Sequence, residues 1–473
     1  MSWAWCVLRW LVRIAVVAGA SIGLAVYAGD LSGAVATRLL QDAGFPDAEV
    51  VVTDIGLNAS RATVWLDKAG AVGGTVAIDH PWRDLLDGRV ARVVVSKARV
   101  RLDVAKDGGV RLAGLALMGG GEGGSGAGLP ANELPVDEFR VEDGAVTLVT
   151  PHGTATASIR LSMARQGAEH QGQATVTAPA KGLPALAVWT GGAAVSEAAG
   201  TLSLKARFRW GGEGLMSQGD LLVREVAGRF GPVAVGGVNG VVKLSSLYPP
   251  VVPKGQTLAV KLLDVGLPLT DGTIRFGLSR GGRLDVERAE WNWAGGLVRA
   301  EPFGITPDRL KGTIDLKAEG VHLGPLLALA AVEGLDATGT VSGHLPVRIA
   351  GDEVHLDGGV LEADGPGTLR YDPSDPPGFL QGPEGSPTDL LMGALTDFRY
   401  DSLRATIDGQ AGGDLGVGIA IRGANPAFYD GYPVALNLKV SGALDRILRQ
   451  SLEAYRIPDA VRDRMTEFER KTP

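Results

Sequence analysis

The stretch LSLKARFRW, residues 202–210, alternates strictly between apolar and polar side chains. Successive side chains of a β-strand point to opposite faces of a sheet, so this segment has one apolar face and one charged face. Such alternation is typical of an antiparallel sheet with one solvated side. The stretch therefore predicts a strand, and the same alternation can be sought in the rest of the chain.

The same alternation recurs along most of the chain, at 98–104, 274–278, 314–318, 403–407 and 434–440. Each segment predicts one further amphipathic strand. The apolar positions expected to line a common surface are Leu202, Leu204, Phe208, Trp210, Ile274, Phe276, Leu278, Val417, Ile419, Ile421, Leu436, Leu438 and Val440.

Helical patterns are few. An amphipathic pattern at 30–44 and an apolar run at 323–332 predict short helices, and Ser386 followed by Pro387 opens a third that runs to Leu395. Residues 443–473 predict two amphipathic helices. The chain is therefore mainly β, but periodicity alone leaves two arrangements open: two sheets packed face to face, or one curled sheet whose apolar face lines a trough.

Composition limits the function. The chain has 473 residues, with 46 Lys and Arg against 53 Asp and Glu, for a formal net charge of −7. This acidic balance disfavours nucleic-acid binding, which needs a basic surplus. Hydrophobic residues make up 45% of the chain, which excludes disorder throughout, and the 69 glycines suit many short strands joined by tight turns.

The N-terminus carries an uncharged apolar run at 14–28 behind Arg9 and Arg13. This predicts a membrane anchor at 1–29, with a cytoplasmic N-terminus and an exported body. A cleaved signal peptide is the alternative, with a small-residue cleavage site ending at Ala28. Beyond it we expect a membrane-proximal helix and first β-region at 30–118, a Gly-rich linker at 119–129, the main β-region at 130–442 and C-terminal helices at 443–473.

No motif predicts an active site. The pattern GLSRG at 277–281 resembles a nucleophile elbow, but a strand-like segment follows Ser279 where a helix is required. The glycines at 119–124 lack the flanking strand and helix of a dinucleotide site. Asp285, Glu287 and Glu290 fit the wet face of a strand better than an acid–base pair. With one cysteine and six scattered histidines, we expect no metal, no cofactor and no enzyme activity.

The C-terminal half carries longer, ordered motifs. They include GQTL at 255–258, DVGLPLTDG at 264–272, ERAEWNWAGG at 287–296, GTVSGHLPV at 339–347, GGVLEA at 358–363, GPGTLRY at 365–371, FRYDSL at 398–403 and GANPAFYDGYPV at 423–434. In these motifs the chain resembles the YdbH-like proteins of the AsmA superfamily.

The resemblance implies a long curled antiparallel sheet, an open β-groove with an apolar lining, behind an N-terminal transmembrane helix. It implies an inner-membrane, single-pass protein with a periplasmic body that moves phospholipids between the two membranes of a Gram-negative envelope. The implied partners are phospholipids, the inner membrane, and a small outer-membrane lipoprotein or a second copy stacked on the C-terminal edge. An envelope scaffold or outer-membrane protein assembly factor stays open as an alternative, as does an exported enzyme using Ser279 or Glu290.

Overall fold

The computed structural model describes residues 32–42, 45–81, 83–84, 89–105, 110–112, 115–116, 136–189, 195–211, 214–230, 233–247, 249–264, 268–306, 311–328, 333–350, 353–374, 383, 386–410, 415–427, 431 and 433–441. The predicted anchor at 1–29, the linker at 119–129 and the helices at 443–473 lie outside these residues. No helix among the described residues has both the length and the apolar character needed to cross a bilayer.

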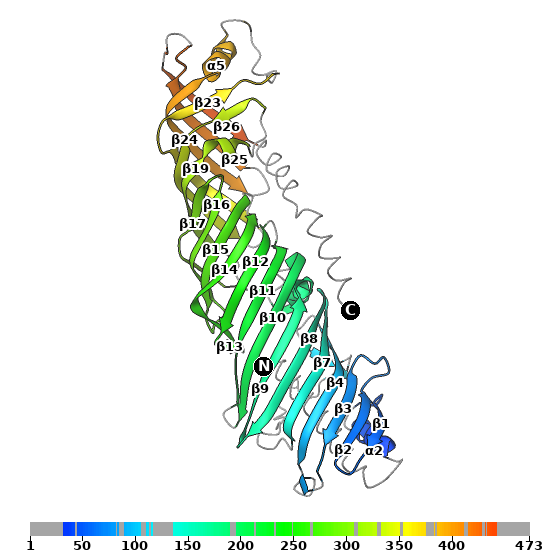
Figure 1. The fold of residues 1–473 in the computed structure, drawn as a ribbon. Helices are drawn as coiled ribbons and strands as arrows, with labels where there is room; N and C mark the ends of the chain where they lie inside the picture. The colour runs from blue at the N-terminus through cyan, green and yellow to red at the C-terminus, as the bar shows by residue number, and fades with distance from the viewer. Residues whose placement is uncertain are drawn as a thin grey trace. The chain divides into compact units, whose positions relative to one another are not determined.

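The chain divides into two compact units. The first comprises Met1–Gly228, Gly237–Leu258 and Gly277–Leu284, and the second comprises Arg229–Gly236, Ala259–Phe276 and Asp285–Pro473. Five strands, β11 (Gly214–Phe230), β12 (Val233–Leu244), β14 (Pro250–Asp264), β15 (Pro268–Leu278) and β16 (Leu284–Trp293), therefore contribute residues to both units. Both units are mainly β (Figure 1).

The first unit begins with the helix α2 and continues almost entirely in strands. Its elements are α2 (Ser32–Asp42), β1 (Glu49–Ile55), β2 (Ala59–Trp65), β3 (Gly73–Asp79), β4 (Val90–Val104), β5 (Val110–Leu112), β6 (Leu115–Ala116), β7 (Val136–Thr150), β8 (Gly153–Gln166), β9 (Glu169–Pro179), the 3₁₀-helix η3 (Ala180–Trp189), β10 (Val195–Gly211), β11 (Gly214–Phe230) and β13 (Ser246–Leu247).

Most neighbouring strands of the first unit pair antiparallel, as the alternation predicts. The exception is the pair β4 and β7, which run parallel with Val90 opposite Val136 and Asp103 opposite Val149. The expectation of a wholly antiparallel sheet is wrong at this pair. A parallel pair needs a long connection, and the segment between β4 and β7, which contains β5 and β6, supplies it.

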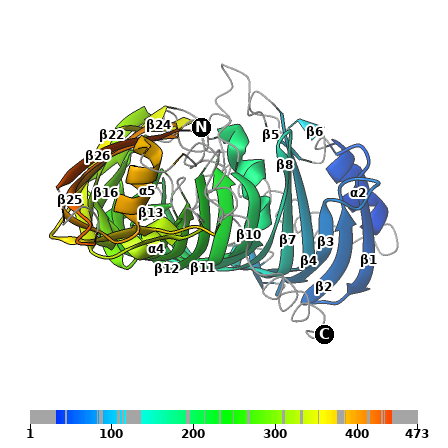
Figure 2. The same ribbon diagram turned by 90° about the horizontal axis from the view of Figure 1, so that it is seen from above.

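The first unit buries one apolar face of its sheet. Ala98, Val100, Leu102 and Val104 of β4 are buried, and the polar residues between them are more exposed. Helix α2 contributes Ala36 and Leu40, one turn apart, to the same core, and the Thr37 hydroxyl accepts a hydrogen bond from the Val50 amide at 2.9 Å. Figure 2 shows α2 beside β1. The helix therefore covers the apolar side of the first strands.

The second unit is also built mainly of strands, and most of them pair antiparallel with their neighbours. Its elements are β16 (Leu284–Trp293), β17 (Gly296–Ala300), β18 (Phe303–Ile305), β19 (Lys311–His322), α4 (Leu323–Ala328), β20 (Leu335–Ala337), β21 (Thr340–Ala350), β22 (Glu353–Ala363), β23 (Gly367–Tyr371), α5 (Pro387–Leu395), β24 (Phe398–Gln410), β25 (Leu415–Ala424) and β26 (Val434–Ser441). The helices predicted at 30–44, 323–332 and 386–395 are confirmed as α2, α4 and α5, and residues 329–332 of the second prediction lie outside the described residues.

The register of the second unit runs in order from β16 through β17, β19, β21, β22, β24 and β25 to β26. Among the described strands no pairing joins β26 back to β16, so this sheet is open rather than closed on itself. Of the two arrangements that periodicity left open, a single open sheet fits this register, because each strand adds to the edge of the one before.

Candidate functional site

The apolar side chains of the second unit form rows that cross the strands at right angles. The longest row, read from register partner to register partner, is Trp291, Val298, Ala318, Gly343, Leu361, Ala405, Ile419 and Leu438. At about 4.8 Å per strand, seven steps extend this row over about 34 Å. Seven of the eight strands place an apolar side chain at this register, and Gly343 of β21 has none.

The first unit carries shorter rows of the same kind. One row is Val141, Leu161, Ala174 and Ala206, and the next is Ile159, Val176 and Leu204. At the strand ends the Phe208 ring lies over Gly172, where a Cβ atom would come within 2.6 Å of the ring. The glycine is what lets the aromatic ring lie flat across its neighbouring strand.

Three of the predicted lining residues, Leu204, Ile419 and Leu438, lie in these rows. Side chains that are half-buried, and so open in part to solvent, are Leu202, Leu204, Phe208, Ile274, Phe276, Leu278, Val417, Ile419 and Leu436. Trp210 and Ile421 are buried, at 5% and 1% exposure. For Leu438 and Val440 the structure describes only their place in β26.

One stretch of the second unit is closed. Eight apolar side chains surround a residual hollow of about 10 Å³; they are Leu269, Trp293, Val298, Leu316, Leu345, Val347, Val354 and Leu356. A space of this size has room for about one water-sized sphere, so it cannot hold a hydrocarbon tail in the described conformation. An open groove is therefore not formed at this point, because the lining side chains fill the space themselves.

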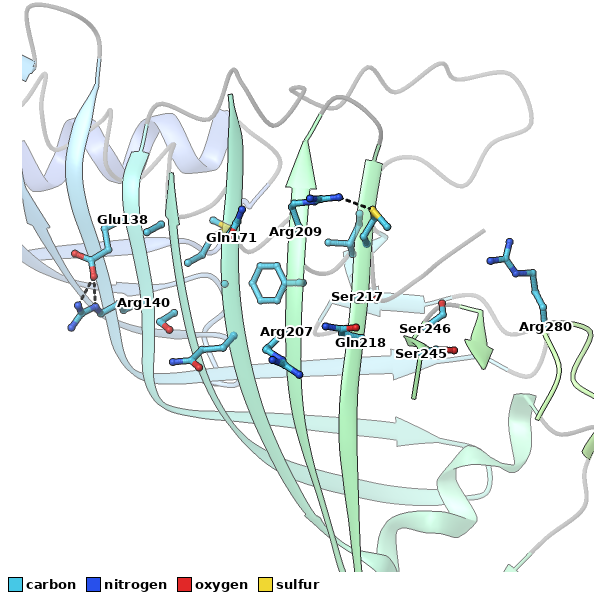
Figure 3. A pocket seen from close by; sticks show the side chains of 18 residues that line it. Glu138, Arg140, Gln171, Arg207, Arg209, Ser217, Gln218, Ser245, Ser246 and Arg280 are labelled. Atoms are coloured by element: carbon cyan, nitrogen blue, oxygen red, sulfur yellow. Dashed lines mark hydrogen bonds and ion pairs between the residues drawn. The ribbon is translucent and has the colours of Figure 1, made fainter. Parts of the chain in front are cut away.

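The first unit also carries a much larger hollow of about 860 Å³, and all of its lining residues belong to that unit (Figure 3). Its lining is mixed, with the apolar side chains Met163, Phe208, Leu215 and Met216 beside polar and charged ones. Two register rows form its floor. They are Glu138, Ala164, Gln171 and Arg209, and Arg140, Ser162, Gln173 and Arg207. Long side chains stand at both ends of each row and shorter ones lie between, which accounts for the concave surface.

Charge in this hollow is strongly one-sided. Four arginines line it, Arg140, Arg207, Arg209 and Arg280, against one acid, Glu138. Burial works to raise the pKa of Glu138, but hydrogen bonds from Arg92 and Arg140 outweigh it and hold that pKa below its ordinary value. The Arg92 Nε lies 2.6 Å from Glu138 Oε2 and the Arg140 Nε lies 2.5 Å from Glu138 Oε1. Glu138, the one acid among the described lining residues, is therefore ionised and already bound by two guanidinium groups.

The residues considered as catalytic candidates in the sequence lie in a turn and in ion pairs. Ser279 closes a tight turn, accepting a hydrogen bond from the Gly282 amide at 3.0 Å. Glu290 is bound by Arg288 at 2.8 Å, and Glu287 by Arg275 at 3.1 Å. These contacts confirm the turn and the wet strand face that the sequence favours.

The structure also reveals one buried pair that sequence reasoning missed. Ser60 Oγ lies 2.7 Å from His80 Nε2, with both residues buried. His80 Nδ1 has no hydrogen-bond partner among the described residues, so the third member of a catalytic triad is lacking there. No cluster of three or more potential metal ligands occurs in the described part of the chain.

The fold and its surfaces thus define a β-sheet protein with extended apolar tracks on one face and ion pairs on the other. The chain belongs to the YdbH-like family, whose model, described as intermembrane phospholipid transport protein YdbH, matches residues 152–466. No curated protein and no solved structure matches the chain. Family membership indicates an envelope protein that serves phospholipid transport between membranes.

Proposed function

We propose that the protein carries phospholipid acyl chains along the apolar rows of its two units, between the inner and outer membranes of a Gram-negative envelope. The observation that carries this proposal is the eight-membered row from Trp291 to Leu438. In the proposal, residues 1–29 anchor the chain in the inner membrane with the N-terminus in the cytoplasm, and residues 30–442 lie in the periplasm as the two β-regions and linker expected from the sequence.

The energetic argument rests on the hydrophobic effect. Each CH₂ group exposed to water costs about 0.8 kcal/mol, so an acyl chain leaves a bilayer only where an apolar surface replaces it. A row of Val, Leu, Ile and Ala offers many similar contacts and no single deep trap. A lipid can then move stepwise along the row with its charged head in water.

The closed stretch around Trp293 and Leu345 sets a condition on this movement. Since about 10 Å³ remains between these side chains, a tail can pass only when they move apart. The described conformation is then the resting state, and the half-buried stretch around Val417, Ile419 and Leu436 is the more accessible end of the row.

The last described strand suggests how the path continues. β26 pairs with β25 on one side, and no described strand pairs with its other edge. An unpaired edge is a template for strand addition. We propose that a small outer-membrane lipoprotein, or a second copy of this chain, adds its own strand there.

The test is a charge placed on the apolar row. In the full-length protein, Ile419→Asp is expected to reduce crosslinking of phospholipid to a photoreactive residue at position 417 by at least tenfold, because an ionised carboxylate cannot be buried against hydrocarbon. The matched control is Ala420→Asp, since Ala420 is exposed on the opposite face of β25 and should leave crosslinking unchanged.

Circular dichroism checks that both variants keep their strand content. Crosslinking of Ile419→Asp at the level of the parent protein would contradict the proposal. Lipid transfer left intact together with impaired assembly of outer-membrane proteins would favour the scaffold function instead.

A further inference from the structure

Arginines on the polar face of the sheet are mostly neutralised by acids on the same or a neighbouring strand. Arg299 lies 2.9 Å from Glu319, Arg404 lies 3.0 Å from Glu362, and Arg348 lies 2.6 Å from Asp357. Such exposed ion pairs contribute little stability individually, but they leave no uncompensated charge. The polar face is therefore balanced along these strands.

The hollow of the first unit departs from this pattern. Arg207 and Arg280 have no hydrogen-bond or ion-pair partner among the described residues, although both line the hollow. Arg209 contacts Glu169 at 3.5 Å and Met216 Sδ at 3.2 Å. A chain with net charge −7 thus gathers four arginines around one occupied acid.

Geometry separates the arginines into two sides of one site. Arg140 and Arg207 stand at opposite ends of the same register row, three strand spacings or about 14 Å apart at their backbones. Ser162 and Gln173 lie between them. Figure 3 shows Arg280 approaching from the far side of the hollow, beyond Ser245 and Ser246.

We propose that this hollow binds the phosphate group of a phosphate ester, with Arg207 and Arg280 as the principal ligands. Arginine presents a planar fork of donors that matches two phosphate oxygens, and several arginines around one concave surface add their attraction for an anion. At about 860 Å³ the hollow exceeds what inorganic phosphate fills and is of the size that encloses a small organic ligand.

We take the ligand to be the glycerophosphate head of a phospholipid, because the proposed function is phospholipid transport. The inference rests on the proposed function only for this choice of ligand. The apolar side chains Met163 and Phe208 line the same hollow as the arginines. A headgroup held by the arginines would therefore lie beside apolar side chains that can contact the first carbons of its tails.

The experiment measures binding of three probes to the full-length protein in a non-ionic detergent by calorimetry. The probes are dihexanoyl phosphatidylglycerol, sn-glycerol 3-phosphate and inorganic phosphate. The parent protein is expected to bind the lipid probe, more weakly at higher salt, and the double variant Arg207→Gln with Arg280→Gln should weaken this binding at least tenfold.

The matched control is Arg160→Gln. Arg160 is exposed on the same face of β8, outside the hollow, and its replacement should change the dissociation constant less than twofold. Arg207→Lys keeps the charge but loses the planar fork, so it should give an intermediate loss. Unfolding temperatures show whether each variant is folded.

Three outcomes decide the matter. Equal binding by the parent and the double variant would overturn the proposal. Equal, arginine-dependent binding of all three probes would support a phosphate site and assign it to free phosphate compounds instead of lipid. Headgroup binding that persists in Ile419→Asp, whose crosslinking to lipid is lost, would support the hollow as a site separate from the acyl path.

Discussion

At the scale of single residues, glycines decide where aromatic side chains can pack. Gly272 of β15 is buried beside the Trp291 ring, and a Cβ atom at this position would lie 1.9 Å from Trp291 Cδ1. Trp291 is itself buried, so the ring has little room to move. The motif DVGLPLTDG therefore ends in a glycine for steric reasons.

Gly272→Ala is expected to lower the free energy of unfolding by about 2 kcal/mol or more, because the added methyl group overpacks the ring. Urea unfolding followed by tryptophan fluorescence measures the loss. The control is Gly312→Ala in β19, where nothing lies within 4 Å of the added carbon, and there the change should stay within about 0.5 kcal/mol. Equal stability of the two variants would show that Trp291 does not need this glycine.

At the scale of elements, short helices cover parts of the apolar face that strands alone would expose. The 3₁₀-helix η3 contacts β7, β8 and β10, and its Ala185 belongs to the core of the first unit. Close approach depends on Gly182, where a Cβ atom would lie 2.7 Å from Ala155 Cβ. The helix can therefore pack closely against β8 because Gly182 has no side chain.

Gly182→Ala should push η3 away from β8. The unit should lose about 1–3 kcal/mol of stability, and hydrogen exchange of the amides at 180–189 should become faster. Lys181→Ala, at the exposed neighbouring position, is the control and should leave exchange unchanged. Unaltered exchange in Gly182→Ala would mean that η3 docks by its other residues.

At the scale of the whole molecule, the proposed function requires both units to take part in each transfer of a lipid. Leu204→Asp charges an apolar row of the first unit, and Ile419→Asp charges a row of the second. Either variant alone should abolish transfer of fluorescent phospholipid between vesicles, and the double variant should be no worse than either.

Lys205→Asp, on the opposite face of β10, serves as the control for Leu204→Asp. If each single variant instead kept about half of the transfer and only the double variant lost it, the two units would act independently. That result would replace a shared path with two separate lipid sites.

Strand periodicity carried much of the prediction. The segments 98–104, 202–210, 274–278, 314–318, 403–407 and 434–440 all lie in strands, and the apolar residues of 98–104 are buried as expected. Alternation is a local property that the chain shows over a few residues, so the printed letters suffice to recognise it. The same holds for helix α5, whose start is marked by Ser386 and Pro387.

Other features depend on contacts between distant segments. Residues that no short pattern relates come together in the parallel pairing of β4 with β7, the closed apolar packing around Trp293 and the Ser60–His80 pair. The same holds for Arg207 and Arg280, which line one hollow. One face of every strand is apolar because of the residues it contains. Whether that face is filled, covered or left open depends on register and on the size of side chains brought beside it, and these are set only when the strands pair.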